Sequence, residues 1–181
     1  MTISTRQGDG GRTRLLSGEE VSKDHPRTSA YGTLDEAVSA IGLGRALAED
    51  ERVRDELRTI QEACFLIGAE LATTAGKASG LKERITAEDL KVLEVLCAEL
   101  EDELDLAPVF TIPGAAAAGA AVDLARTIVR RLEREVVSLE KEEDLDNPVL
   151  LPYLNRLSDA LFLLARYEEK QQGVAPEHRE G

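Results

Sequence analysis

The sequence predicts an all-α protein, a bundle of five helices, on three observations. From about residue 33 to residue 172, apolar residues recur at spacings of three and four, the period of helices that pack on a common core. The links between these segments are short, which favours antiparallel neighbours. No stretch shows a convincing strand pattern. A length of 181 residues suits one domain, and with three Phe and three Tyr the core must consist of Leu, Ile, Val and Ala.

The first helix is expected after an N-terminal arm. Residues 1–30 are polar and contain glycine and threonine, so we expect an ordered or half-ordered arm there. Thr33 and Glu36 form a capping box, which predicts a helix over 34–49. A second helix is expected over 51–74, on the apolar stripe Val53, Leu57, Ile60, Cys64, Ile67 and Leu71.

Three further helices complete a bundle over 33–172. Thr86 and Asp89 give the start signal of a helix over 87–104, after a glycine-containing connection. A loop bounded by prolines, 105–113, leads into a helix over 115–142, whose first turns are glycine and alanine and permit close packing. Asn147 as N-cap and Pro148 at the first helical position predict a fifth helix that ends near residue 172. Residues 173–181 are expected to form a flexible tail.

Composition excludes several classes of partner. The net charge of −13 disfavours nucleic acid, and no stretch approaches the roughly 20 apolar residues of a membrane span. Cys64 and Cys97 lie in helical patterns and are interpreted as buried free thiols of a cytoplasmic protein. No Glu-x-x-His occurs, which disfavours a ferritin-like di-metal bundle.

The fourth predicted helix carries a column of positive charge. Arg126, Arg130 and Arg134 are four residues apart and therefore share one face. Asp123 and Glu133 offset part of their repulsion. The column is either a solvated face with local ion pairs or an anion site, for which the planar fork of arginine is suited. A separate apolar stripe, Leu124, Ile128 and Leu132, is expected to face the core.

Three acidic residues and an amide on the other helices each have two interpretations. Leu154, Leu157, Leu161 and Leu164 account for the core face of the fifth helix. Asn155 and Asp159 lie on another face, either as surface decoration or to orient a nucleotide or pair with an arginine of the fourth helix. Asp35 and Glu36 either compensate the helix dipole or find an arginine across a helix or subunit boundary.

The arm contains a glycine stretch that is similar to a phosphate-binding loop. The segment QGDGGRT, residues 7–13, is not a Walker A motif, because no Gly-Lys-Ser/Thr leads into a helix. By itself the stretch is also explained as a turn. Possible phosphate donors surround it: Thr5, Arg6, Thr13, Arg14, Lys23 and Arg27.

Four blocks together resemble the PduO-type ATP:cob(I)alamin adenosyltransferases. In the family's order they are STRQGDGGRT, KDHPRTSAYGTLDE, FTIPG with ARTIVRRLERE, and NRLSDALFLLARY. The resemblance runs from about residue 3 to residue 167. It implies a trimer of five-helix bundles, with ATP bound between the N-terminal arm of one subunit and the helices of its neighbour.

The resemblance also implies roles for individual residues. Nucleotide-binding positions fall on Thr5, Arg6, Gly8, Asp9, Gly11, Thr13 and Lys23 in the arm, and on Arg130, Glu133, Arg134 and Asn155 in the helices. Glu133 is the position that holds the metal, Mg²⁺. Catalytic positions fall on Arg126, Arg130, Asp35 and Phe110. Asp35 and Arg126 match an ion pair that crosses the subunit interface, and Phe110 matches the aromatic that shapes the corrinoid's lower face and keeps its lower axial ligand away.

The chemistry so implied is transfer of the adenosyl group of ATP to cob(I)alamin, with release of triphosphate. A flavoprotein reductase and an adenosylcobalamin-dependent client enzyme are the implied partners. The chain departs from the family pattern at Ser4, Ala37, Val38, Ala115 and Asp123, of which Asp123 replaces a histidine. These departures keep a second hypothesis open, a diverged relative that binds ATP or a corrinoid without turnover. A purely structural helical bundle is the third.

Overall fold

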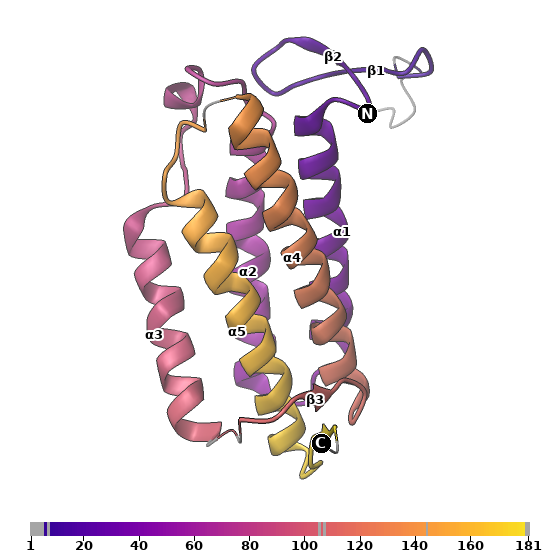
Figure 1. The fold of residues 1–181 in the computed structure, drawn as a ribbon, viewed down its shortest axis with the longest axis vertical. Helices are drawn as coiled ribbons and strands as arrows, with labels where there is room; N and C mark the ends of the chain where they lie inside the picture. The colour runs from indigo at the N-terminus through magenta and orange to yellow at the C-terminus, as the bar shows by residue number, and fades with distance from the viewer. Residues whose placement is uncertain (1–5, 7, 105, 107, 144, 180–181) are drawn as a thin grey trace.

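The computed structural model describes residues 6, 8–104, 106, 108–143 and 145–179. Five long helices form the body of the molecule, and their axes lie side by side (Figure 1). The helices are α1 Pro26–Leu47, α2 Glu51–Leu71, α3 Ala87–Leu104, α4 Ala117–Glu142 and α5 Leu150–Gln171, with a 3₁₀ turn at Ala78–Gly80. The predicted five-helix bundle is therefore confirmed, and no helix of the described residues is long and apolar enough to cross a membrane.

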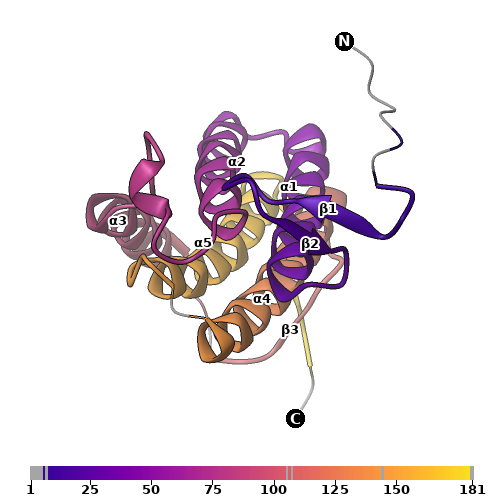
Figure 2. The same ribbon diagram turned by 90° about the horizontal axis from the view of Figure 1, so that it is seen from above.

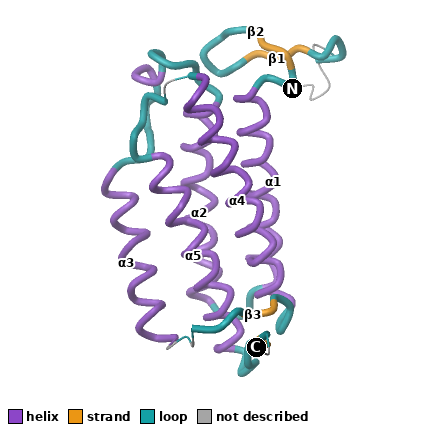
Figure 3. Tube along the Cα trace, in the orientation of Figure 1, coloured by secondary structure: helices purple, strands orange, loops and turns teal. Residues whose placement is uncertain are grey.

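Helix α4 is the centre of the arrangement. It packs against α1 on one side and α5 on the other, while α2 packs on α1 and α3 on α5. Successive helices run in opposite directions, as Figure 3 shows along the chain trace. The packed pairs α1–α2, α1–α4 and α4–α5 are therefore antiparallel, as the short connections predicted, whereas α3 and α5 pack together while running in the same direction.

Two small antiparallel strand pairs lie at opposite ends of the bundle. β1 Arg12–Arg14 pairs with β2 Glu20–Ser22 beside the start of α1, and Figure 2 shows this hairpin from above. β3 Thr111–Ile112 pairs with β4 Glu177–His178 at the other end. The expected flexible tail over 173–181 thus differs from the structure, because part of it adds a strand to the loop before α4. Main-chain hydrogen bonds make this pair, and no side-chain pattern announces it.

Helix α1 begins earlier than predicted. It starts at Pro26 and not near Thr33, and the ring nitrogen Nδ1 of His25 accepts a hydrogen bond from the backbone N–H of Arg27 at 3.2 Å. Proline at the first helical position is favourable there. Thr33 lies buried within the helix, so the capping box predicted for it and Glu36 does not form.

At the other helices, one predicted start is confirmed and another begins later than predicted. Thr86 and Asp89 do form a reciprocal cap before α3: the backbone N–H of Thr86 donates to Asp89 at 2.8 Å, and that of Asp89 donates back to Thr86 at 3.3 Å. Helix α5 begins at Leu150 rather than at Pro148. Asn147 nevertheless satisfies a backbone donor at this end, since its Oδ1 accepts a hydrogen bond from the N–H of Val149 at 3.0 Å while its buried amide nitrogen donates to Glu70 at 2.9 Å.

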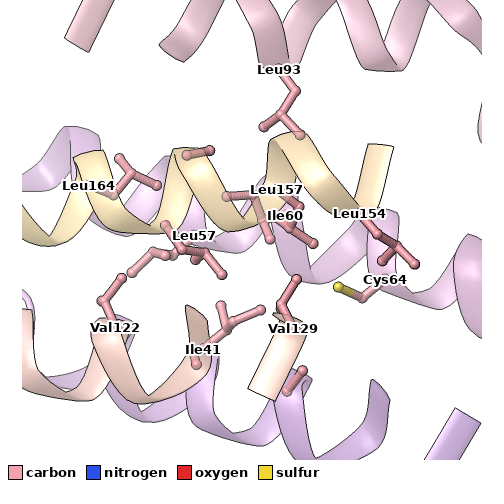
Figure 4. Close-up of a cluster of buried hydrophobic side chains, with 14 of the residues drawn as sticks. Ile41, Leu57, Ile60, Cys64, Leu93, Val122, Val129, Leu154, Leu157 and Leu164 are labelled. Carbon is pink, nitrogen blue, oxygen red and sulfur yellow. The ribbon is translucent and has the colours of Figure 1, made fainter. Parts of the chain in front are cut away.

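The core is aliphatic, as composition requires. The six stripe positions of α2 and the four leucines of α5 are all buried, and Figure 4 shows many of them converging with side chains of α1, α3 and α4. Both cysteines are buried free thiols.

The core face of α4 differs from the predicted stripe. Of the predicted stripe, Leu132 is buried and Ile128 packs partly buried against the core, but Leu124 is 52% exposed. The buried residues of α4 beside Leu132 include Val122, Ala125, Val129, Val136 and Leu139. Residues 122 and 124 project about 200° apart on a helix, so a stripe through one cannot include the other. Because α4 lies between two helices, the buried side follows the small and β-branched residues that allow close approach. The Cβ of an alanine at position 44 would lie 2.7 Å from Cγ2 of Val122, so Gly44 sets the α1–α4 distance.

Candidate functional site

A hollow in the described surface lies where α3, α4 and α5 meet. It has a volume of about 440 Å³. Its lining residues are Glu101, Leu106, Arg126, Arg130, Ser158, Asp159, Phe162 and Leu163. Two arginines of the predicted column therefore face the same concave surface, and an anion can approach both.

Arg126 is fixed by a carboxylate one turn away. Its Nε donates to Oδ1 of Asp123 at 3.0 Å, and the other oxygen of Asp123 accepts from Nη2 of Arg166 at 2.6 Å. Arg166 in turn lies against Glu169, with Nε 2.8 Å from Oε2. Asp123, Arg166 and Glu169 are all buried. Burial raises the pKa of the Glu169 carboxyl, and the charge of Arg166 opposes that rise.

Phe162 joins these groups to the hollow. The guanidinium carbon of Arg126 lies 6.0 Å from the centre of its ring, and that of Arg166 lies 5.4 Å from it. A ring face attracts cations at this range. The aromatic ring therefore supports the orientation that Asp123 gives to Arg126.

The upper part of the arginine column is open. Arg130 and Arg134 are both exposed, and Nη1 of Arg134 donates to the backbone carbonyl of Arg130 at 2.8 Å. Beside them, the amide of Asn155 donates to Oε1 of Glu133 at 3.0 Å and so links α5 to α4. Asp159 pairs with Arg156 of its own helix at 2.7 Å, although it also lines the hollow.

A second hollow adjoins the first through Leu106 and Phe162. It has a volume of about 260 Å³ and is lined mainly by the loop before β3. Phe110 lies here with 81% of its surface exposed, although it is a large apolar residue. The strand pair at this end holds the loop, since the backbone N–H of Arg179 donates to the carbonyl of Phe110 at 3.0 Å. His178 lines the same hollow.

The glycine stretch folds as a tight turn ahead of the β1–β2 hairpin. Gly11 has φ +75°, its N–H donates to the carbonyl of Gly8 at 3.2 Å, and its carbonyl accepts from the N–H of Lys23 at 2.9 Å. A Cβ at Gly8 would lie 2.9 Å from Nζ of Lys23. Glycine is thus required at 11 by conformation and favoured at 8 by the approach of the lysine.

The other predicted arm residues are placed as follows. Arg6 is exposed, Thr13 is the middle residue of β1, and Asp9 donates from its N–H to the carbonyl of Arg6 at 3.3 Å. Thr5 and Ser4 lie outside the described residues. Arg27, expected as a phosphate donor, is buried: it donates to the carbonyl of Leu71 at 3.2 Å and is therefore occupied in holding the fold.

Within one chain the described part of the arm, residues 6 and 8–30, makes no contact with the arginine hollow through a hydrogen bond or ion pair. The hairpin hydrogen-bonds to the end of α2, with the N–H of Leu16 donating to the carbonyl of Ala72 at 2.8 Å. Figure 1 places the hairpin at one end of the bundle and β3, next to Phe110, at the other. Among the described residues, no hydrogen bond or ion pair joins the arm to Arg126, Arg130 or Arg134.

Asp35 is exposed on α1, and no described residue forms an ion pair with it. Its neighbour Glu36 pairs with Arg131 of α4. Arg126 has Asp123 as its carboxylate partner within the chain. The ion pair of Asp35 with Arg126 stays a prediction about the assembled protein.

The described residues contain no group of three His, Cys, Asp or Glu side chains that could enclose a metal. Mg²⁺ does not need one: it is commonly held by one or two carboxylates together with substrate phosphates. Glu133 fits that pattern, since it is partly exposed beside the open arginines and Asn155 orients it through one oxygen.

Comparison with known families decides what this arrangement belongs to. The model of the family "Cobalamin adenosyltransferase" matches residues 3–168. The chain belongs to the cobalamin adenosyltransferase family.

Curated members of the family are similar over nearly the whole chain. The corrinoid adenosyltransferase PduO of Salmonella typhimurium is 41% identical over 169 residues, which are 93% of this chain and 50% of that protein. A corrinoid adenosyltransferase of Citrobacter freundii is 41% identical over 172 residues, 95% of this chain and 97% of that one. The chain thus spans about half the length of the first relative and nearly all of the second.

Solved structures of family members have the same fold as this chain. A variant of the PduO-type ATP:corrinoid adenosyltransferase of Lactobacillus reuteri, in complex with cobalamin and ATP, superposes with a TM-score of 0.93 at 31% identity. The match covers 99% of this chain and 100% of that one. A second variant of that enzyme, in complex with ATP, gives a TM-score of 0.91.

The structure brings four further residues, which the sequence did not single out, to the edge or the support of the hollows. Phe162, Arg166, Glu169 and His178 all border or support the hollows. A signal existed for two of them: Arg166 and Glu169 fall on the buried side of an otherwise apolar helix and are three apart, which is an ion-pair spacing. The sequence predicted that Asp123 offsets part of the repulsion in the arginine column and also marked it as a departure from the family pattern.

Proposed function

We propose that this chain transfers the 5′-deoxyadenosyl group of ATP to the cobalt of cob(I)alamin, forming adenosylcobalamin and triphosphate. The observation that carries the proposal is the pair of joined hollows: one presents Arg126 and Arg130, and the other presents the exposed ring of Phe110. The relatives named as corrinoid adenosyltransferases, and the structural neighbour in complex with cobalamin and ATP, support it.

The reaction is a nucleophilic displacement at carbon. The electron pair of cobalt(I) attacks C5′ of the ribose and forms the Co–C bond. The C5′–O bond breaks, and its electron pair leaves with triphosphate. No protein group becomes covalently attached, so the chain contributes positioning and stabilisation of the charge that develops on the leaving oxygen.

The open arginines supply that stabilisation. Arg130 and Arg134 are exposed, which leaves their guanidinium groups accessible to phosphate oxygens. One preorganised donor of this kind contributes about 3 kcal/mol to the transition state. In the arm, the turn from Gly8 to Gly11 lies close to Lys23, whose ammonium is a second donor for the same triphosphate.

Magnesium bound with ATP neutralises part of the triphosphate charge and orients the leaving group. Glu133 is the residue that would hold it, and Asn155 keeps the carboxylate in place from the neighbouring helix. Arg134 and Arg130 flank this carboxylate on the same helix, so phosphate and metal can be bound together.

Because one chain keeps its arm away from its own arginines, we infer that the complete site forms between subunits. The arm of one subunit closes over the α4–α5 surface of another, and a homotrimer is the assembly proposed. Asp35 then becomes a candidate partner for Arg126 across the interface. In the second hollow, Phe110 contacts the lower face of the corrinoid and keeps the lower axial ligand from the cobalt.

A cytoplasmic location, a flavoprotein reductase that delivers the electron, and a client enzyme that receives the product complete the proposal. The alternative, a diverged relative that binds ATP or a corrinoid without turnover, rested partly on Asp123. The relatives do not favour it, and Asp123 has a built-in role as partner of two arginines.

The direct test mixes the protein with ATP, Mg²⁺ and chemically reduced cob(I)alamin, and follows the visible spectrum of the corrinoid. A light-sensitive adenosylated product with release of triphosphate is the expected result. Binding of ATP without any product would contradict the proposal and support the alternative.

Two variants locate the phosphates. Arg130→Ala is expected to lower ATP-dependent turnover while the free energy of unfolding stays near that of the wild type, since Arg130 is exposed. Arg58→Ala is the matched control, because it removes an exposed arginine of α2 that pairs only with Glu62 on its own helix. Equal effects of the two variants on turnover would contradict the placement of Arg130.

A further inference from the structure

Asp123 accepts hydrogen bonds from two arginine side chains that belong to different helices. Its Oδ1 accepts from Nε of Arg126 on α4, at 3.0 Å, and its Oδ2 accepts from Nη2 of Arg166 on α5, at 2.6 Å. The Asp123 side chain is 3% exposed and that of Arg166 1% exposed, while that of Arg126 is 24% exposed toward the hollow. Asp123 thus connects the buried guanidinium of Arg166 to the accessible guanidinium of Arg126.

Without Arg126, the buried part of this cluster contains one arginine and two carboxyl groups. Arg166 already lies against Glu169, at 2.8 Å, so that pair carries one charge of each sign. Asp123 adds a second negative charge, and Arg126 is the cation that completes the balance. A buried carboxylate is costly unless it is paired and hydrogen-bonded, so the cluster favours the conformation in which Arg126 turns toward Asp123.

That conformation leaves the outer part of the guanidinium accessible. The hydrogen bond to Asp123 uses Nε, and no described residue accepts from the two terminal nitrogens of Arg126. Phe162 lies at 6.0 Å from the guanidinium carbon. A planar fork held by one edge and by its face presents its remaining edge in one direction.

We propose that Asp123 is a positioning residue that aims the terminal nitrogens of Arg126 into the hollow, toward the triphosphate or toward a carboxylate of a neighbouring subunit. The proposal rests on the proposed function for what Arg126 meets there. It also gives Asp123 a defined function in the site. The resemblance alone showed only that Asp123 stands where the family usually has histidine.

The test is a double-mutant cycle with Asp123→Asn and Arg126→Ala. Asp123→Asn keeps the shape and removes the charge. In the wild-type background it is expected to lower kcat for adenosyl transfer by roughly 10- to 100-fold, the range for a misaligned catalytic group, with a smaller change in KM for ATP. In the Arg126→Ala background the same substitution is expected to change kcat less than about twofold, because its target is absent.

Glu70→Gln is the matched control. Glu70 is also buried and also accepts hydrogen bonds from several groups, among them Asn147 and the backbone N–H of Ile85, but it does not contact Arg126. Both Asp123→Asn and Glu70→Gln are expected to lower the melting temperature, whereas only Asp123→Asn is expected to lower kcat. Asp123→Glu serves if the asparagine variant fails to fold: it keeps the charge but moves the carboxylate, so kcat is expected to fall while stability is largely retained.

Equal loss of kcat from Asp123→Asn in both backgrounds, or unchanged kcat in both Asp123 variants, would overturn the proposal. Failure of the proposed function is a separate outcome. If the wild-type chain forms no adenosylated product, the cycle is read in melting temperatures, where non-additive effects of the two substitutions support the coupling of Asp123 with Arg126 and additive effects refute it.

Discussion

The closeness of α1 and α4 can be tested by adding a single methyl group. An alanine at position 44 would place its Cβ 2.7 Å from Cγ2 of Val122 and 3.4 Å from the backbone nitrogen of Val122. Contacts below 3.0 Å require movement, and here the helix backbone stands directly behind the valine. At position 32 on the same helix, no described residue outside the surrounding helical turns has backbone atoms within 4 Å of the added Cβ, and no side chain beyond the adjacent residues does either. Gly32→Ala is therefore the matched control.

Both substitutions gain free energy from the higher helix propensity of alanine, but only Gly44→Ala also loses free energy by overpacking. Alanine is preferred over glycine within a helix by about 1 kcal/mol, so Gly32→Ala is expected to stabilise the chain by about that amount. Gly44→Ala has the same gain, opposed by about 1–3 kcal/mol for overpacking. The expected difference between the variants is therefore about 2 kcal/mol, or roughly 4–8 °C in melting temperature for a chain of this size.

Urea unfolding followed by circular dichroism at 222 nm measures this difference. Both variants must be compared at one protein concentration, because association of subunits adds to apparent stability. Equal stability of Gly44→Ala and Gly32→Ala would refute the reasoning, since it would mean that α1 and α4 separate at no cost. The packing argument for the GAAAAGAA segment at the start of α4 would then fail with it.

Further predictions concern single features of the fold. Burial raises the pKa of the Cys64 thiol to about 12 and that of Cys97 to about 11, so iodoacetamide at pH 8 should label neither in the native protein and both in urea; rapid native labelling would contradict their burial. Thr86→Ala removes the reciprocal cap of α3 and should lower the free energy of unfolding by about 1 kcal/mol, as urea titration will show. A chain that ends after Ala175 lacks β4, so amide exchange around Phe110 should accelerate while exchange in α2 stays constant; unchanged exchange around Phe110 would show that the tail does not hold this loop.

Much of the candidate site could be predicted from the sequence, because its residues lie on single helices. Arg126 and Arg130 are four apart, and a helix places such residues on one face whatever surrounds it, so their common face followed from the spacing, whereas the hollow beside them depends on α3 and α5. The glycine stretch likewise announced a turn, since a left-handed conformation at Gly11 suits glycine. The roles of these residues came from the resemblance of four blocks to one family, which the match over residues 3–168 bears out at the level of the family.

The parts that the sequence did not predict are contacts between distant segments. The pairing of Asp123 with Arg166 joins residues 43 positions apart, and it exists only because α4 and α5 pack side by side. Likewise, Leu124 is exposed because the neighbours of α4 select which apolar side is buried, and both sides carried leucine or isoleucine.

The sequence by itself determined the five helices, the core stripes of α2 and α5, and the family. These depend on interactions between residues three or four apart, or on short motifs, which the chain order records directly. Only the tertiary structure decided which side of α4 is buried, where Arg126 points, how the tail holds Phe110, and that one chain's arm lies away from its own arginines. Each of these depends on the packing of helices against one another, where the free energy of burying one side chain is set by neighbours that local sequence does not specify.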